Sequence, residues 1–412
     1  MNNILNNVVT DDEETEDIFG DDIVNIAAPI INAPIKAGNN IFNNIHDAVI
    51  TEEDRNHDLY LQPRGDPNAC IQNFYEEVIP AYTDQQFYEH FRMHRNVFEE
   101  LVSIIEARIA ILNANPENNS DNDSGIPMRK KILLTIWVLA TPDSYRSIAD
   151  RFGLGKSKAH TCFKEIVSIL ADLISEFVTW PNEDLLREIE QVFMERSQNR
   201  FPGIVGAIDG CHIQIKQPPH NAHDFYNRKE THSVILQGTC DHTGKFTDVL
   251  IGRPGRCHDA SVLHSSALYR RLIDPVHPLL SNCQHLLGDS GYPLSTHILT
   301  PFRDNGHLSD QETRYNVVHA SCRSIIERAF GLLKVKFRRL YHLDVQSVTM
   351  ANVMIAASCT LHNFNLMRGQ ANIWDNINFV NENRDDDDHY DDDIGDDDSD
   401  GVIKRDRIME AM

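Results

Sequence analysis

The 412-residue sequence has no long hydrophobic run. No stretch approaches the run of about 18 uninterrupted apolar residues that a transmembrane helix needs. The start of the chain is polar and acidic and lacks the basic region that begins a secretory signal. These two absences argue against a membrane protein, and we expect the chain to be intracellular.

The sequence also lacks a pattern of paired cysteines. Its eight cysteines are scattered and form no CxxC pair and no dense framework. In an intracellular protein such cysteines are expected to stay reduced. The spacing therefore predicts free thiols and gives no indication of a structural zinc site.

Basic residues are few, because 38 Lys and Arg stand against 62 Asp and Glu and give a formal charge of −24. Taken as a whole, that charge argues against a nucleic-acid partner. However, residues 1–30 hold eight acids and residues 385–400 hold eleven, with no Lys or Arg in either stretch. Without these two stretches the formal charge is −5. Acidic runs of this kind are usually solvated, so the folded body must be judged separately.

The composition, with 41% hydrophobic residues, supports a sizeable core in two or three domains. Residues 1–65 are predicted to be a disordered acidic and Asn-rich arm, and residues 370–412 an acidic disordered tail. Between these ends, residues 84–198 show helical periodicity, whereas residues 200–365 contain short β-rich runs. We therefore expect an all-α region followed by an α/β domain.

Within the helical region, residues 144–170 read as a helix, a short turn with glycine, and a second helix, which is helix-turn-helix spacing. Gly153 suits a positive φ at the turn, and Ser157 could cap the second helix. In a DNA-binding unit of this type the second helix enters the major groove. It would then present Lys156, Lys158, His160 and Lys164 to DNA. An ordinary helical hairpin remains the alternative.

The α/β region predicts three strands, a helix, a strand and a long final helix, in that order. Asp209 is expected at the end of the first strand and Asp289 at the end of the fourth, and a glycine follows each within two residues. Carboxylates at the carboxyl ends of neighbouring strands point into one crevice. Glu327 lies on the final helix, whose predicted buried stripe includes Ile326 and Phe330.

Three carboxylates at one edge of a sheet suit Mg²⁺ or Mn²⁺, since these hard cations prefer oxygen ligands. Two such ions can activate the attacking oxygen and stabilise the leaving oxygen during phosphodiester cleavage. Taken singly, Asp209 and Asp289 could be simple turn residues and Glu327 an exposed helix charge. The order of the elements favours the metal interpretation.

A basic stripe accompanies Glu327, because residues 323–339 hold six Lys or Arg and one acid. Its members Arg323, Lys334 and Arg338 are predicted to bind the nucleic-acid backbone. Arg228 and Lys229 form a further cation pair that could bind DNA, although such a pair is often plain surface.

Residues 203–364 resemble the transposase domain of PIF/Harbinger elements and the nucleases derived from Harbinger transposases. The stretches that carry the resemblance are GIVGAIDGCHIQIKQP, FYNRKETHSVILQGTCD, GRPGRCHDASVL, LLGDSGYPL, YNVVHASCRSIIERAFGLLKVKFRRL and CTLHNF. The resemblance implies an RNase H-like fold with a DDE triad, which corresponds to Asp209, Asp289 and Glu327 here. It also implies a Myb/SANT-like DNA-binding partner.

Other candidate site residues carry weaker signals. Asp259 could be a fourth ligand, but its position at the start of a helix favours a capping role. His212, His232 and His258 cluster in the sheet region without a fourth partner at zinc-ligand spacing.

Together these observations predict a metal-dependent DNA endonuclease or transposase that uses Mg²⁺ or Mn²⁺ at a two-metal site. The expected location is the nucleus, with cytoplasmic protein when no partner is present, and the chain could form a homo-oligomer. The alternative is a catalytically silent DNA-binding or scaffold protein, against which the intact triad argues.

Overall fold

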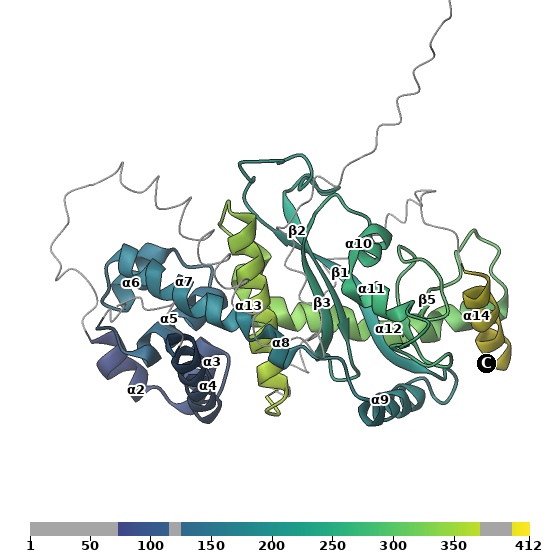
Figure 1. Ribbon diagram of the computed structural model, residues 1–412, viewed down its shortest axis with the longest axis horizontal. Helices are drawn as coiled ribbons and strands as arrows, with labels where there is room; N and C mark the ends of the chain where they lie inside the picture. Colours follow the sequence, from purple (N-terminus) through teal and green to yellow (C-terminus); the bar gives the residue numbers. More distant parts are fainter. Residues whose placement is uncertain (1–72, 115–124, 371–397) are drawn as a thin grey trace, which may run out of the picture.

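The computed structural model describes residues 73–114, 125–370 and 398–412. The predicted arm at residues 1–65 and Cys70 lie outside these ranges, as do residues 371–397 of the predicted tail. Figure 1 shows a helical region beside a mixed α/β region, with a long helix, α13, between them. In the described part of the chain, no helix is long and apolar enough to cross a membrane.

The helical region begins ten residues before the predicted boundary at Asp84. It consists of a π-helical turn η2 (Phe74–Val78) and helices α2 (Ile79–Ala81), α3 (Asp84–Phe91), α4 (Arg95–Asn113), α5 (Met128–Ala140), α6 (Tyr145–Arg151), α7 (Lys156–Asp172), α8 (Ile174–Phe177) and α9 (Glu183–Arg196). α5 is the central helix, because all its residues from Lys130 to Ala140 are buried. The buried ammonium of Lys131 is paired with Glu165 of α7 at 2.8 Å, so its charge is compensated inside the bundle.

Helices α6 and α7 are joined by the short turn that the sequence predicts, with Gly153 at φ 63°. Ile148, Phe152 and Cys162 supply buried positions, as expected. The predicted cap is wrong, because α7 begins at Lys156, its N-cap is Gly155, and Ser157 lies inside the helix.

The sheet has five strands in the order β3-β2-β1-β4-β5. They are β1 (Ile204–Gln214), β2 (Ser233–Cys240), β3 (Phe246–Pro254), β4 (His285–Leu287) and β5 (Ile298–Leu299). β1, β2 and β3 are antiparallel neighbours, whereas β4 runs parallel to β1 and β5 runs parallel to β4. The predicted order of elements is confirmed, and β5 is an additional strand.

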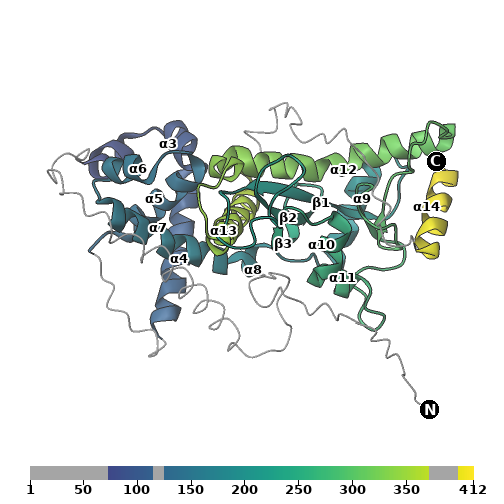
Figure 2. The ribbon, with the colours of Figure 1, turned by 90° about the horizontal axis from the view of Figure 1, so that it is seen from above.

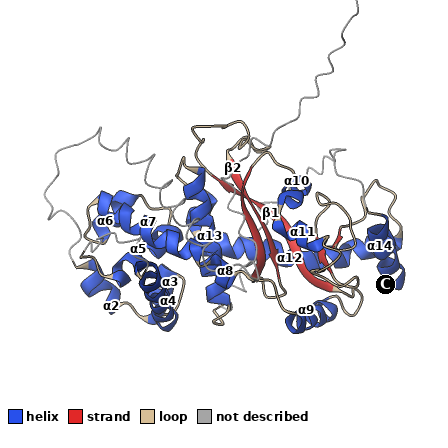
Figure 3. Ribbon diagram, viewed as in Figure 1, coloured by secondary structure: helices blue, strands red, loops and turns tan. Residues whose placement is uncertain are grey.

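Helices cover both faces of the sheet (Figure 3). They are α10 (Asp259–Ser265), α11 (Ala267–Leu272), α12 (Asp310–Lys336) and α13 (Val348–Leu366), with a 3-10 turn η4 (Arg338–Tyr341) between the last two. One core joins the sheet to α12 and α13, and a second core joins the opposite face to α10 and α11. Figure 2 shows α12 on one side of the strands and α10 and α11 on the other.

Two helices cross the boundary predicted between the domains. α9, which the sequence places in the helical region, packs against β1. α13 packs against α7 as well as β2 and β3. The two regions are therefore joined through shared helices.

The prediction of a disordered tail is wrong for the last residues, because Ser399–Ala411 forms helix α14, which packs against α12 and β5. The Lys404 ammonium donates to the Gln284 carbonyl at 2.9 Å and the Thr296 carbonyl at 2.8 Å. Ile408 is buried, and Gly401 lies against the backbone of Ser295. Specific hydrogen bonds and close packing outweigh the local acidity that suggested disorder.

Replacement of Gly401 by alanine tests how α14 is held. Gly to Ala normally stabilises a helix by about 0.5–1 kcal/mol. Here a Cβ would lie 2.6–3.0 Å from Ser295 backbone atoms, so we expect Gly401→Ala to destabilise the docked helix by about 1–3 kcal/mol. Faster hydrogen exchange at residues 399–411 measures this loss of stability. Ile403→Ala, at a position 47% exposed, is the control and should leave exchange unchanged. If both variants protect residues 399–411 from hydrogen exchange equally well, the proposed close contact is contradicted.

Candidate active site

The structure brings the three predicted acids together from β1, β4 and α12. Ala207 of β1 pairs with Leu287 of β4 in parallel register. Asp209 and Asp289 each lie two residues beyond that pair, so the two carboxyl groups occupy corresponding positions on neighbouring strands. Glu327 approaches from α12, which packs on the same face of β1. The predicted grouping of these residues is therefore present.

The structure around Asp209 differs from the sequence prediction in one respect. β1 continues to Gln214, and Asp209 pairs with Gly238 of β2, so Asp209 lies within the strand rather than at its end. The first strand is therefore longer than the one predicted to end at Asp209. Gly210 makes no turn there. It leaves room for a second acid, because a Cβ at this position would overlap Oδ1 of Asp259.

Arg323 joins two of the three acids. Its Nη1 donates to Asp209 Oδ2 at 3.1 Å, and its Nη2 donates to Glu327 Oε1. The carboxylate of Asp289 also acts on this guanidinium. We predicted that Arg323 faces DNA phosphates, and the structure contradicts this because the side chain is 20% exposed and is held between acids.

The acids of the site repel one another. Burial, and then the neighbouring Asp289 carboxylate, raise the pKa of Asp209 from 3.8 to about 7. The Arg323 guanidinium and the Gly210 N–H, which donates to Asp209 Oδ1 at 2.8 Å, lower that pKa, and Glu327 raises it. Such a group of like charges in one place is characteristic of sites that bind a cation or exchange a proton.

Asp259 is a fourth carboxyl group of this site, which the sequence argument set aside as a helix cap. The N-cap of α10 is His258, and Asp259 is the first helical residue. A Cβ built at Gly291 would lie 3.2 Å from Asp289 Oδ1 and 3.4 Å from Asp259 Oδ2, so the two carboxylates flank that glycine. The signal in the sequence was the His-Asp pair after the Gly-rich stretch at 252–258. It could not be distinguished from an ordinary helix start.

Tyr292 lies behind these acids and is 1% exposed. Burial raises its pKa well above the ordinary value, and Asp259, Asp209 and Asp289 raise it further. Its hydroxyl has no hydrogen-bond partner among the described residues. The phenol therefore stays protonated and offers one donor next to three carboxylates.

The donor set has the chemistry that suits Mg²⁺ or Mn²⁺, because it consists of carboxylate oxygens. The raised pKa of Asp209 results first from burial and then from the Asp289 carboxylate, and Arg323 offsets it only in part. In the described residues, however, no three His, Cys, Asp or Glu side chains are arranged to hold a metal ion together. The residues fit a divalent cation in kind, and Arg323 lies between two of them in this conformation.

The three predicted histidines make separate contacts. His212 Nδ1 lies 2.9 Å from Ser233 Oγ, the ring of His232 lies 5.3 Å from that of Tyr226, and His258 Nδ1 lies 3.4 Å from Arg228 Nη2. These contacts favour positioning roles, for His212 within β1 and for His258 at the start of α10. Arg228 and Lys229 are exposed, and Arg228 lies next to the residue that precedes Asp259.

The basic stripe of α12 is not one continuous surface. Lys336 and Arg339 are 1% and 5% exposed, and Arg339 donates to the Val138 carbonyl at 3.0 Å. Lys334 Nζ donates to the His212 carbonyl at 3.0 Å, and Arg338 is exposed. In the helical region, Lys156 and Lys158 are exposed and Lys164 is half-buried. The predicted buried stripe is confirmed, since Ile326 and Phe330 are 0% and 5% exposed.

Comparison with known proteins identifies the domain that contains this site. The profile of the DDE superfamily endonucleases matches residues 208–363. Residues 208–363 are therefore similar to DDE superfamily endonucleases, and the relatives named as Harbinger-derived nucleases point to the same family. This confirms the resemblance found in the sequence.

Three relatives show how far the similarity extends. The Arabidopsis thaliana protein "Antagonist of Like Heterochromatin Protein 1" is 26% identical over 69% of this chain and 74% of its own length. The human "Putative nuclease HARBI1" is 26% identical over 65% of this chain and 75% of its own. The Arabidopsis "Protein ALP1-like" is 27% identical over 64% and 66%. No solved structure shows significant similarity.

The titration of Asp209 predicts how stability depends on pH. Asp209 has a pKa of about 7 in the folded protein and an ordinary value of 3.8 when unfolded. Between these values the folded state binds more protons, so the free energy of unfolding decreases as pH rises through this window. Asp209→Asn removes the ionisable group. We expect a higher Tm than the parent at about pH 8 and no gain near pH 4.

Asp248 provides the control for this measurement. It is 5% exposed on β3, and burial raises its pKa to about 7 while Arg271 lowers it. Asp248→Asn should show the same pH-dependent gain without altering the acids around Arg323. If Asp248→Asn gains stability at alkaline pH and Asp209→Asn does not, the pKa of Asp209 is not raised in the folded protein.

Proposed function

We propose that this chain is a metal-dependent DNA endonuclease of the Harbinger type, which hydrolyses phosphodiester bonds and can also transfer strands. The observation that carries the proposal is the convergence of Asp209, Asp289 and Glu327 on one guanidinium within a DDE endonuclease domain. The sheet order, with three antiparallel and two parallel strands covered by helices, supports an RNase H-like assignment.

Asp209, Asp289 and Glu327 would hold Mg²⁺ or Mn²⁺, and Asp259 would join them from α10. When bound, the divalent ions polarise the phosphate and lower the pKa of the attacking water. Asp209 must lose its proton first, which its pKa of about 7 permits near neutral pH. Because Arg323 binds Asp209 and Glu327 in this structure, a bound cation would compete with its guanidinium for these two carboxylates. Tyr292 can donate a hydrogen bond that orients a neighbouring carboxylate.

DNA would be held by two sets of cations. Lys334 contacts the His212 carbonyl of β1, Arg338 is exposed on η4, and Lys156 and Lys158 are exposed on α7. We propose that α6 and α7 act as a helix-turn-helix unit and that Lys156 and Lys158 lie along the groove. Arg228 and Lys229 would add phosphate contacts beside Asp259. The nuclear location, a Myb/SANT-like partner and self-association remain proposals of the sequence argument.

A catalytically silent DNA-binding or scaffold role is the second candidate. It is favoured by the position of Arg323, which neutralises two of the acids that a metal would need. One relative also has a name that describes antagonism rather than nuclease activity. This role differs from the first in one measurable property, since it requires DNA binding without cleavage.

Neutralising the acids should abolish cleavage. Asp209→Asn, Asp289→Asn and Glu327→Gln should each reduce Mg²⁺- or Mn²⁺-dependent nicking of supercoiled DNA by more than about tenfold, because a neutral amide is a poor ligand for these ions. Asp259→Asn should reduce nicking too, whereas a capping residue would affect only stability. Asp248→Asn is the control and should retain activity.

The outcomes separate the two candidates. A parent protein that nicks DNA with added metal and stops in EDTA supports the nuclease. Cleavage that survives any of the three substitutions at more than about a tenth of the parent rate would contradict the assignment. A parent that binds DNA but nicks none under any metal supports the scaffold role.

The two sets of cations should differ in their dependence on DNA sequence. Replacing Lys334 and Arg338 by alanine should weaken binding to all duplexes alike and lower the salt slope by about 0.9 for each lost contact. Replacing Lys156 and Lys158 should weaken preferred sites most, since a helix in the major groove reads bases. Competition binding at two salt concentrations measures both effects.

Arg187→Ala is the control for loss of a single charge, because its side chain is 67% exposed on α9 and pairs only locally with Asp184. If the Lys156 and Lys158 variants bind every sequence as the parent does, α6 and α7 form an ordinary helical hairpin. Base reading must then come from a partner protein.

A further inference from the structure

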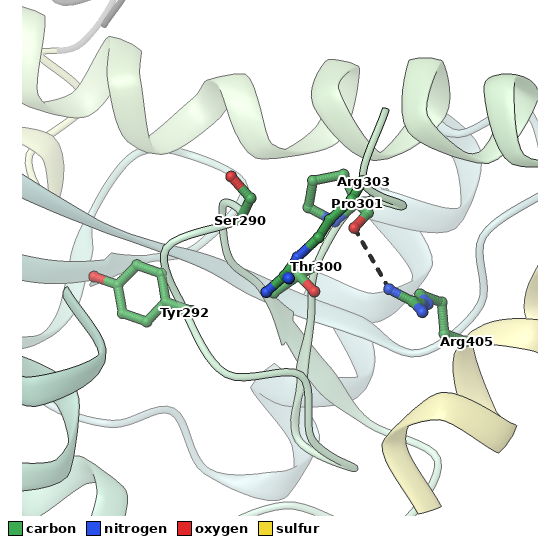
Figure 4. A pocket seen from close by; sticks show the side chains of 6 residues that line it. All are labelled: Ser290, Tyr292, Thr300, Pro301, Arg303 and Arg405. Carbon is green, nitrogen blue, oxygen red and sulfur yellow. Dashed lines mark hydrogen bonds between the residues drawn. The ribbon is translucent and has the colours of Figure 1, made fainter. Parts of the chain in front are cut away.

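A cavity of about 190 Å³ lies beside the Asp289 loop and outside the acids described above. It is lined by Ser290, Tyr292, Thr300, Pro301, Arg303 and Arg405. Figure 4 shows these side chains around the segment that follows β5, with Arg405 reaching in from α14. The lining contains two guanidinium groups and two hydroxyl groups besides the phenol, and none of these six residues is acidic.

Arg405 is held in place before any ligand arrives. Its guanidinium carbon lies 4.0 Å from the centroid of the Phe302 ring, and its Nη1 lies 3.4 Å from the Pro301 carbonyl oxygen that it donates to (Figure 4). Its Nε is buried and has no hydrogen-bond partner among the described residues. A fixed guanidinium with unused donors loses little conformational entropy when it binds an anion.

Arg405 and Arg303 are the two charged residues of the lining. The charge of Arg405 acts on Glu312, whose Oε2 accepts the Ser309 N–H at 2.7 Å as part of a helix cap. Arg303 is exposed on the same loop and brings the second positive charge. The six lining residues therefore include two cations and no acid, in a chain whose formal charge is −24.

The cavity lies directly beside the loop that carries Asp289. Ser290 follows Asp289 directly, and Tyr292 lines the cavity while also responding to the charges of Asp209, Asp259 and Asp289. An anion bound here would lie one residue along the chain from a catalytic carboxylate. Two arginines with hydroxyl donors recognise phosphate oxygens well, because guanidinium groups can donate two hydrogen bonds to one phosphate.

We infer that this cavity is a phosphate subsite, which binds a backbone phosphate of the DNA strand next to the scissile bond through Arg303 and Arg405. The inference rests on the proposed function, since it takes DNA as the ligand. It assigns a role in substrate binding to α14, the segment whose composition suggested a disordered tail. Without α14 the subsite would lose one of its two arginines.

The test measures binding of the full-length chain to a fluorescein-labelled duplex in EDTA, where cleavage cannot contribute. Arg303→Gln and Arg405→Gln should each weaken binding by about tenfold at low salt, because each removes a charge-assisted contact. The double variant should lower the salt slope by about 1.8. Arg407→Gln is the matched control, since Arg407 is exposed on the same helix and loses the same charge, and it should bind as the parent does.

Arg405 also contacts Pro301 and Phe302, so its replacement could loosen α14. Hydrogen exchange at residues 399–411 shows whether the helix stays docked, and Arg303→Gln tests the subsite without altering α14. Arg405→Lys, which keeps the charge, should recover part of the affinity. The inference is overturned if Arg303→Gln binds as the parent does, or if Arg407→Gln loses as much affinity as Arg405→Gln.

The result is distinguishable from failure of the nuclease proposal. If the parent cleaves DNA and the arginine variants bind DNA normally, the subsite inference is wrong and the nuclease proposal stands. The parent could instead show no cleavage while the arginine variants lose DNA binding and the Arg407 control does not. The subsite inference then stands for a DNA-binding protein that is not a nuclease.

Discussion

Repulsion between partly buried carboxylates is the constraint on which this structure depends. β1 and β4 place Asp209 and Asp289 side by side, and α12 and α10 add Glu327 and Asp259. Without a cation this arrangement costs free energy, because each carboxylate opposes the ionisation of the others. Two devices reduce the cost in the folded chain: the Arg323 guanidinium and a proton on Asp209, whose pKa is about 7. A divalent cation would be a third, and it would compete with both.

The Asn363 amide joins the two regions of the chain through one buried side chain. Its Nδ2 donates to the Phe177 carbonyl at 2.9 Å and the Phe246 carbonyl at 2.7 Å, and its Oδ1 accepts the Phe246 N–H at 2.9 Å. Phe177 belongs to α8 and Phe246 to β3, so α13 connects a helix of one region to a strand of the other. The preceding His362 donates its Nε2–H to the Gly244 carbonyl, 3.0 Å away. The CTLHNF stretch of the resemblance is thus explained by packing and hydrogen bonding, not by chemistry at the acids.

Motifs and periodicity located much of this fold and site, and they failed where tertiary contacts decide. The triad was found because each acid follows a recognisable pattern of strand or helix. The strand that contains Asp209 was expected to end there, since Asp209 and Gly210 resemble a turn and only pairing with β2 shows that the strand continues. Asp259 was missed because a carboxylate at a helix start has an ordinary explanation. The cations at residues 323–339 were expected to form a surface, although Lys336 is buried and Arg339 of η4 is buried and donates to the Val138 carbonyl of α5.

The acidity of the chain makes the position of each exposed cation matter more than the net charge does. Of the six cations at residues 323–339, Arg323, Lys336 and Arg339 are engaged or buried within the fold. The cations that remain for binding a polyanion form a few separate groups. These lie at the end of α12 and on η4, on α7, and on α14 near the end of the chain. Exposed charges farther apart than about 10 Å are largely screened at moderate salt. Each group must therefore act locally, and the acids can repel DNA only where no cation is close. A cation pair next to the Asp289 loop is then the arrangement by which an acidic protein could bring a phosphate toward a cluster of carboxylates.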